Sequence, residues 1–231
     1  MSSNIFYNLV LTTVLAVFSV KVLSLDSICY GTTSSGALKN GVKLPQSGNN
    51  YITYSSLASG LGRTYVHTAV SDIIVNAYKK LEVEQPNKVF KYAETGFKEG
   101  GRFKPHKTHQ NGLSVDFMTP VVNQKNESVH LPTNALNKFG YNIEFNDLGE
   151  HENYRIDYEA MAAHIVMLHK EARLLGYEIW RVIFDPKLQS GLFKTRYKNY
   201  LKSNITFSKK RSWVRHDEHY HIDFSIPCKQ R

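Results

Sequence analysis

The stretch Tyr158-Glu-Ala-Met-Ala-Ala-His-Ile-Val-Met-Leu-His-Lys-Glu-Ala-Arg-Leu-Leu175 carries the clearest structural signal of the chain. Its apolar residues recur three and four positions apart, which predicts the main core helix, and Gly176 follows as a typical helix end. The next segment, Tyr177-Glu-Ile-Trp-Arg-Val-Ile-Phe184, alternates and contains β-branched residues, so it predicts a strand. We therefore expect a fold in which a long helix leads directly into a sheet.

Outside this unit, helices and strands follow one another without a regular rhythm. A second apolar stripe predicts a helix over 68–84, ending before Pro86, and 192–203 predicts a short basic helix. The sequence predicts strands at 87–95, 114–118 and 219–225, and loops with short strands, including 51–54, over 26–62. Since the sequence contains neither a series of βαβ units nor an internal repeat, the predicted fold class is α+β.

The composition is that of a globular protein with a basic surface. Of 231 residues, 42% are hydrophobic and 12% aromatic, which is enough for a buried core in a single domain. The 21% of charged residues and the two Cys exclude a disordered chain and a disulfide-dense mini-protein. The formal charge of +9 predicts attraction to an anion, but charge alone does not choose among nucleic acid, an acidic membrane and a wall polymer.

The first 24 residues predict a secretory signal peptide. Leu9–Val20 is uncharged and too short to span a bilayer comfortably, and Val22 and Ser24 are the small residues that precede cleavage. Lys21 interrupts the end of the apolar run, which leaves an uncleaved membrane anchor as the alternative. We expect 1–24 to be removed, so that 25–231 forms a single domain.

The two cysteines lie almost at opposite ends of that mature chain. Cys29 and Cys228 would then face a compartment in which disulfides persist. A bridge between them would close a loop of roughly 200 residues, worth on the order of 5 kcal/mol in the chain-entropy model. The alternative is a pair of unpaired buried thiols.

Five of the ten histidines fall in two short windows. The first is His106-Lys-Thr-His109-Gln-Asn-Gly-Leu-Ser-Val-Asp116, and the second is His216-Asp-Glu-His219-Tyr-His221-Ile-Asp223. Each pattern alone is weak, because a chain with this many His produces such spacings by chance. Their occurrence together is what points to a site.

Strand alternation gives the second window two faces, with His219, His221 and Asp223 on one and Tyr220, Ile222 and Phe224 on the other. In a strand over 114–118, Asp116 likewise points away from its apolar neighbours. Two such strands side by side could present two imidazoles and one carboxylate to a zinc ion. The fourth coordination position would stay open for water, as in catalytic zinc sites.

The remaining histidines are interpreted as hydrogen-bonded surface residues, with the two on the core helix at its flank: His67, His130, His151, His164 and His169. Other catalytic motifs are not supported. Ser114 lies near His109 but has no nucleophile elbow around it. Gly100 and Gly101 are not followed by the Gly-Lys-Ser/Thr of a phosphate loop.

The chain resembles the penicillin-insensitive murein endopeptidases, zinc peptidases of the lysostaphin and D-alanyl-D-alanine metallopeptidase group. The matching stretches cover nearly the whole mature chain: Gly36–Pro45, Gly100–Phe117, Trp213–His221 and Pro227-Cys228. The resemblance implies a small antiparallel sheet that carries the zinc site and is flanked by helices. This chain departs from the family in having fewer cysteines, and in Ser114, where an acidic residue is common.

Carried over position by position, the resemblance implies that His109, Asp116 and His221 bind one zinc ion. It implies that His219 is the catalytic histidine, with His106 and His216 as further site residues. Zinc would activate water and polarise the scissile carbonyl, and His219 could accept the proton or stabilise the oxyanion. No acyl-enzyme on serine is needed, so we expect insensitivity to β-lactams.

The resemblance implies a periplasmic enzyme that cuts peptidoglycan cross-links between D-alanine and diaminopimelate. Nucleic acid is not an expected partner, and neither is stable membrane insertion after signal cleavage. A carboxypeptidase or dipeptidase of the same metal group is the nearest alternative. The others are a basic wall-binding module without activity and a non-haem iron oxygenase, since two His and a carboxylate also bind iron.

Overall fold

The computed structural model describes residues 25–212 and 214–231. The predicted signal peptide, 1–24, lies outside the described residues. Among the residues that are described, no helix is both long and apolar enough to cross a bilayer. Helices and strands are mixed throughout, which confirms the predicted α+β class.

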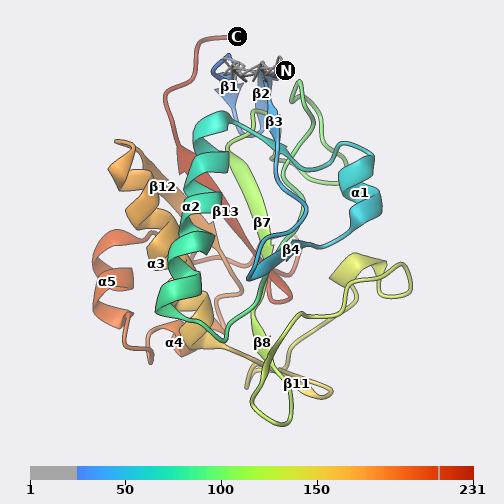
Figure 1. Cartoon of the computed structure of the whole chain (residues 1–231), viewed down its shortest axis with the longest axis vertical. Coiled ribbons are helices and arrows are strands. Elements are labelled where there is room, and N and C mark those ends of the chain that lie inside the picture. Colours follow the sequence, from blue (N-terminus) through green and yellow to red (C-terminus); the bar gives the residue numbers. More distant parts are fainter. Residues whose placement is uncertain (1–24, 213) are drawn as a thin grey trace, which may run out of the picture.

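A five-stranded sheet forms the centre of the molecule (Figure 1). Its strands lie in the order β12 (Glu178–Ile183), β13 (His219–Ser225), β7 (Ser114–Met118), β6 (Phe90–Tyr92) and β4 (Tyr51–Thr53). Neighbours are antiparallel except β4 and β6, which are parallel. This pair departs from the expected antiparallel sheet because a long crossover joins its two strands, and parallel strands require such a connection.

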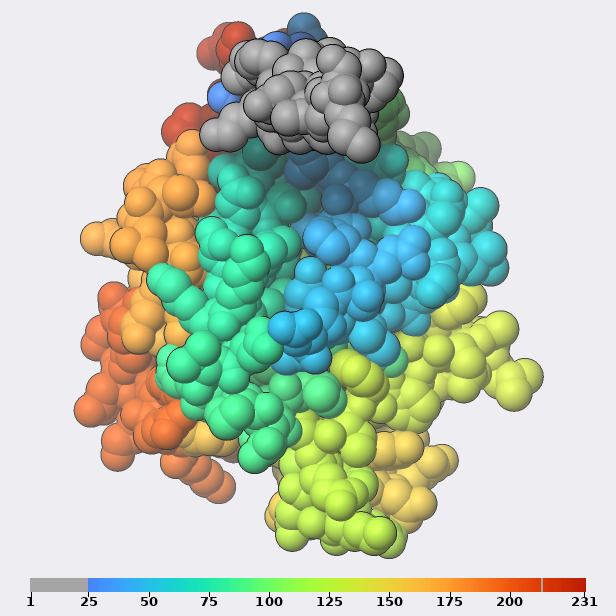
Figure 2. All heavy atoms as spheres, viewed as in Figure 1, coloured from blue at the N-terminus to red at the C-terminus, as the bar shows by residue number. Residues whose placement is uncertain are grey.

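That crossover contains α2 (Thr68–Glu84), which packs beside the core helix α3 (Tyr158–Leu174) along the sheet (Figure 1). Both helices confirm the ranges predicted from their apolar stripes, to within one residue for α3. Seen from the same side with all atoms, α2 and the chain near 40–60 cover the central strands (Figure 2). The helices therefore cover one face of the sheet.

The remaining elements are short. A 3₁₀ turn occupies Lys138–Gly140, and three short helices are α1 (Ser56–Gly60), α4 (Gln189–Leu192) and α5 (Lys198–Asn204). The predicted basic helix over 192–203 is thus wrong as one element, because α4 ends before Phe193 and α5 begins only at Lys198. Two small sheets have two strands each: β1 (Ile28–Thr32) pairs with β2 (Ser35–Lys39), and β3 (Val42–Lys43) pairs with β5 (Tyr65–Val66). A four-stranded sheet contains β8 (Val121–Val122), β9 (Ser128–Val129), β10 (Glu150–His151) and β11 (Tyr154–Ile156).

The predicted disulfide is present and joins the two ends of the described chain. Cys29 on β1 and Cys228 after β13 are bonded, with their Cα atoms 4.8 Å apart. Gly31 also donates a backbone hydrogen bond to Lys229. The bridge closes a loop of 199 residues, so it stabilises the folded chain by about 5 kcal/mol in the chain-entropy model.

The interpretation of His164 and His169 as surface residues is wrong. Both side chains are buried, His164 completely. The apolar stripe of α3 was expected to leave a solvent-exposed flank, but most of the helix is covered by the sheet and the neighbouring helices. His164 contacts Tyr78, Phe117 and Tyr220, so it belongs to the core on the helix side of the sheet.

Candidate active site

The candidate site lies on the other face of the sheet, where β7 and β13 pair. Their register sets His221 opposite Asp116 and Asp223 opposite Ser114. The predicted alternation of β13 is confirmed, because Tyr220 points to α3 while His221 points to Asp116. The two strands predicted to lie side by side are therefore direct neighbours.

The loop between β6 and β7 brings two further histidines over this face. His109 has a positive φ of 67°, a left-handed conformation that residues other than Gly seldom adopt. Gly96 packs so closely beneath it that a Cβ there would lie 2.8 Å from the His109 carbonyl oxygen. The His109 Nδ1 then lies 3.0 Å from the Thr95 carbonyl oxygen, which fixes the direction of the ring.

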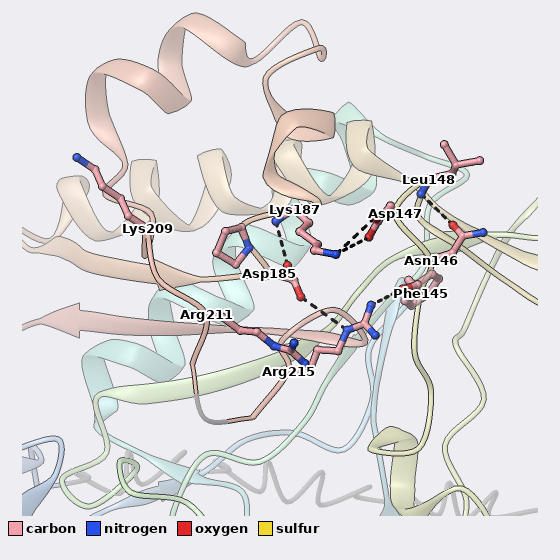
Figure 3. Close-up of a pocket in the computed structure, with 10 residues that line it drawn as sticks. Phe145, Asn146, Asp147, Leu148, Asp185, Lys187, Lys209, Arg211 and Arg215 are labelled. Atoms are coloured by element: carbon pink, nitrogen blue, oxygen red, sulfur yellow. Dashed lines mark hydrogen bonds and ion pairs between the residues drawn. The ribbon is translucent and has the colours of Figure 1, made fainter.

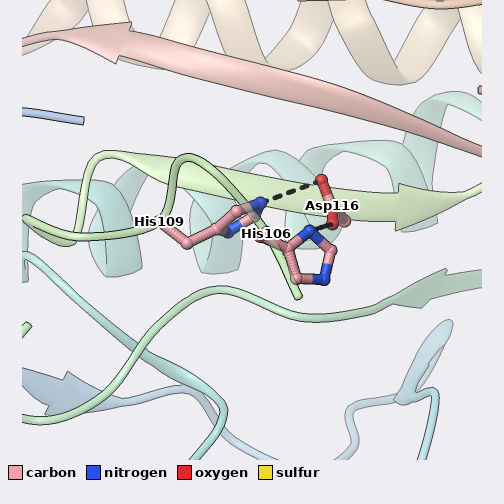
Figure 4. Close-up of side chains that lie close together, drawn as sticks. All are labelled: His106, His109 and Asp116. Carbon is pink, nitrogen blue, oxygen red and sulfur yellow. Dashed lines mark ion pairs between the residues drawn. The ribbon is translucent and has the colours of Figure 1, made fainter. Parts of the chain in front are cut away.

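Four imidazoles converge on the Asp116 carboxylate, two of them shown in Figure 4. Ring nitrogens lie 2.7 Å from it in His221, 3.3 Å in His109, 3.7 Å in His106 and 4.0 Å in His219. The possible ligand atoms of His106, His109 and Asp116 all lie within 4.8 Å of one another. All of these side chains except the half-buried His106 are buried.

The donor set fits a cation. A carbonyl oxygen only accepts, so His109 must donate from Nδ1 to Thr95, and the lone pair of its Nε2 faces Asp116. Both His109 Nε2 and Asp116 Oδ2 are buried without a hydrogen-bond partner. Unpartnered lone pairs on two neighbouring buried side chains are costly unless a positive ion lies close to both.

His221, on β13, also lies beside Asp116 in a position that suits a positive charge. Its Nε2 lies 2.8 Å from Asp223 Oδ1, to which it donates, while Nδ1 faces Asp116. Burial lowers the pKa of His221, but Asp223 and Asp116 outweigh it and raise the pKa to about 10. The two carboxylates thus favour a positive charge at this position, supplied either by a proton on Nδ1 or by a metal ion.

Asp223 is itself held by other side chains. It accepts hydrogen bonds from Ser114, at 2.6 Å, and from Arg181, at 2.7 Å. Burial raises the pKa of Asp223, yet His221, Ser114 and Arg181 together hold it well below its usual range. Asp223 therefore remains a carboxylate that can orient His221, as outer partners of metal-binding histidines do.

His219 points into the same cleft, with Glu218 behind it. Its Nδ1 lies 2.7 Å from Glu218 Oε1, so Nε2 is left toward Asp116 and the cleft. Burial lowers the pKa of His219, but Glu218 and Asp116 more than compensate and raise the pKa to about 9. A ring oriented by a carboxylate in this way is suited to proton transfer.

His106 is anchored on the opposite side of the cleft. Its Nε2 contacts Glu94 and lies 3.0 Å from the Tyr141 hydroxyl. Burial raises the pKa of Glu94, but hydrogen bonds from His106 and Arg63 lower it to about 2. Burial holds the pKa of Tyr141 well above 10, so its hydroxyl stays protonated and can donate to a substrate.

The cleft is a pocket of about 270 Å³ whose lining includes His106, Tyr141, Arg181, His216, His219 and His221. His216 donates from Nδ1 to the Val214 carbonyl oxygen at 2.8 Å, and its ring centroid lies 4.6 Å from that of His219. Burial, together with His219, lowers the pKa of His216 to about 3. It therefore enters the cleft as a neutral ring.

The structure brings all six predicted site residues together and adds several that sequence reasoning missed. Glu94, Tyr141, Arg181 and Glu218 all contact one of the histidines or their partners. Glu218 lies between two quoted histidines and could have been found, whereas Glu94 and Tyr141 have no motif around them. Asp217 binds the Phe145 amide and Arg215, so it orients no histidine.

Fold and cleft together define a small α+β protein with a group of His and Asp side chains that could hold a metal ion. Residues 29–231 match the family model of the penicillin-insensitive murein endopeptidases, and the chain belongs to this family. It is thus a peptidase of a family that acts on murein, which confirms the resemblance seen in the sequence. No curated protein matches the chain.

Proposed function

We propose that this chain is a zinc-dependent endopeptidase that hydrolyses the peptide cross-links of murein, between D-alanine and diaminopimelate. The observation that carries the metal dependence is that His109 Nε2, 3.3 Å from Asp116 Oδ1, and Asp116 Oδ2 are both buried without a hydrogen-bond partner. Family membership supports the substrate. The charge of +9 suits an anionic wall.

The proposed ligands are His109, Asp116 and His221, each offering an unshared pair toward the same point. Zinc bound there would supply a Lewis acid that polarises a carbonyl and activates water. His106 lies close enough to be a ligand instead of His221. We assign it to the cleft wall because its Nδ1 lies 3.7 Å from Asp116, whereas the Nδ1 of His221 lies 2.7 Å away, and because its side chain is only half-buried.

The other cleft residues would handle protons and orient the peptide. His219, held at Nδ1 by Glu218 and with its pKa raised to about 9, would carry a proton at Nε2 that stabilises the oxyanion and passes to the leaving amine. Tyr141, which keeps its proton, would donate a hydrogen bond to the developing oxyanion. His106 and His216 narrow the cleft on either side of this pair.

The enzyme would work in the periplasm. We propose that residues 1–24 are a cleaved signal peptide and that 25–231 is the single mature domain. The Cys29–Cys228 bond supports this assignment, because disulfides persist in oxidising compartments.

The test is digestion of purified cross-linked muropeptide dimers by zinc-loaded 25–231, with and without a chelator, read by mass spectrometry. We expect chelator-sensitive conversion of dimers to monomers whose masses locate the cut. Loss of only a terminal D-alanine would show a carboxypeptidase instead. Intact dimers after incubation with folded, zinc-loaded protein would refute the endopeptidase.

A matched set of variants tests the ligand assignment. His109→Ala, Asp116→Ala and His221→Ala should each abolish stoichiometric zinc binding, whereas His106→Ala should retain the ion. If His106→Ala loses zinc and His221→Ala keeps it, the third ligand is His106.

A further inference from the structure

A second pocket, larger than the cleft, lies directly beside it. This basic pocket has a volume of about 680 Å³, and its lining includes Phe145, Asp147, Lys187, Lys209, Arg211 and Arg215 (Figure 3). In Figure 3, the segment with Lys209 and Arg211 runs along one side, and Asp147 lies on the other. None of its residues is a proposed ligand or catalytic histidine.

Residues of 209–212 and 214–216 line both pockets. Lys209, Arg211 and Arg215 line the basic pocket, whereas Ser212 and His216 line the cleft. Arg211 and Ser212 are sequence neighbours, as are Arg215 and His216, and successive Cα atoms are only about 3.8 Å apart, so the linings of the two pockets adjoin at these residues. An extended peptide advances about 3.4 Å per residue, so a substrate residue two or three positions from the scissile bond can reach the basic pocket.

Part of the positive charge in this pocket is already neutralised. Arg215 lies 3.1 Å from Asp217 and 3.0 Å from Glu144, and Lys187 lies 3.2 Å from Asp147. These ion pairs hold the side chains of Arg215 and Lys187 in place in the lining of the basic pocket. They leave Arg215 and Lys187 satisfied, so these two cations do not require a ligand.

Lys209 and Arg211 differ from them. Within 25–212 and 214–231, neither side chain has an acidic partner at salt-bridge distance, and both are exposed. Two uncompensated cations at the rim of a pocket are suited to an anion, and a guanidinium binds a carboxylate through two parallel hydrogen bonds. Exposed Leu148 adds apolar surface for the aliphatic part of a peptide.

We propose that the basic pocket is a substrate subsite in which Lys209 and Arg211 bind a free carboxylate of the murein stem peptide. The inference rests on the proposed function. The matching group is the α-carboxylate of the γ-linked glutamate, which lies two residues before the D-alanine of the cross-link. This subsite makes the enzyme sensitive to amidation of its substrate.

The test compares two cross-linked muropeptide dimers that differ only in this group, carboxylate against carboxamide. We expect the wild-type enzyme to favour the carboxylate by about tenfold in kcat/KM, mainly through KM, as charge-assisted hydrogen bonds contribute. In Lys209→Gln/Arg211→Gln the preference should fall to about one. The matched control Lys79→Gln/Lys125→Gln removes the same charge at exposed positions outside both pockets, and should keep the preference.

Equal rates on both dimers with the wild-type enzyme, or an unchanged preference in the double variant, would overturn the subsite. Failure of the proposed function is distinguishable, since the zinc-loaded enzyme would then cut neither dimer. Calorimetric binding of the uncleaved stem peptides decides the subsite in that case. Tighter binding of the carboxylate form, lost in the double variant only, supports it, and equal binding refutes it.

Discussion

Two buried histidines, His164 and His221, lie on opposite faces of the same sheet, and their surroundings differ. His164, on α3, lies on the helix side of the sheet among Tyr78, Phe90 and Phe117, with Tyr220 as its hydrogen-bond partner. His221 faces the cleft and lies between two carboxylates. Their exposed fractions are 0% and 2%, so burial does not distinguish them.

Their pKa values nevertheless move in opposite directions. Burial lowers the pKa of His164 to about 3, because no carboxylate offsets the loss of hydration. The pKa of His221 rises to about 10, because Asp223 and Asp116 outweigh burial. The carboxylates, rather than burial, set His221 apart from a packing histidine, and Asp116 is the carboxylate that His106, His109, His219 and His221 share.

The first prediction removes the charge of Asp116, the carboxylate that distinguishes the surroundings of His221 from those of His164. We expect Asp116→Asn to lose stoichiometric zinc and to lower kcat/KM by at least about 10³-fold, since metal catalysis supplies several kcal/mol. Metal analysis and muropeptide digestion measure this. The control is Asp72→Asn on the exposed side of α2, which should keep both. A folded Asp116→Asn enzyme with full zinc and activity would contradict the site.

A change at His219 should separate proton transfer from metal binding. We expect His219→Gln to keep zinc and to lower kcat by about 10²- to 10³-fold, the usual contribution of general acid–base catalysis. Glu218→Gln should have a smaller effect in the same direction, because it removes only the group that orients the ring. Loss of zinc from His219→Gln would make His219 a ligand.

The sequence could predict the cleft side of β13 because strand alternation is local. His219, His221 and Asp223 share a face whatever the strand pairs with. Their approach to Asp116 depends on the register between β13 and β7, which the sequence leaves open. The resemblance to a known family supplied that connection.

The burial of His164 could not be predicted from the apolar periodicity of its helix. An apolar stripe on α3 predicts one covered face, but packing against α2, α4, α5 and β12 covers more than one. Glu94 and Tyr141 were missed for another reason, since they reach His106 from distant segments of the chain. Contacts that arise only from tertiary packing leave no spacing to detect.

The lowered pKa of His164, on the helix side of the sheet, can be tested by measuring stability at acid pH. When pH falls from 6.5 toward 3, unfolded His164 binds a proton that the folded chain excludes, so the free energy of unfolding decreases. This stability is fully present above pH 6.5, and about 2 kcal/mol of it is lost by pH 5. Other histidines also contribute to the pH dependence of unfolding, so denaturant unfolding of metal-free wild-type protein at pH 7.5 and pH 5 is compared with that of a His164 variant.

His164→Phe should remove that loss. The variant leaves the buried Tyr220 hydroxyl unpartnered, which costs about 1–3 kcal/mol at pH 7.5. We expect this deficit to shrink by about 2 kcal/mol at pH 5, because only the wild-type chain still excludes a proton. A deficit that is the same at both pH values would show that His164 titrates normally in the folded protein.

The smallest effect is expected at Ser114, where packing and the site meet on β7. Its hydroxyl is one of three donors to Asp223, and Ser114→Ala leaves the bonds from Arg181 and His221 in place. We expect a loss of about 1 kcal/mol in the free energy of unfolding. Zinc affinity should weaken by no more than about tenfold, the lower end for outer partners of ligands. If stability falls while affinity is unchanged, Ser114 serves only the core. If affinity falls as well, the carboxylate network that sets His221 apart from His164 extends through Asp223 to this hydroxyl.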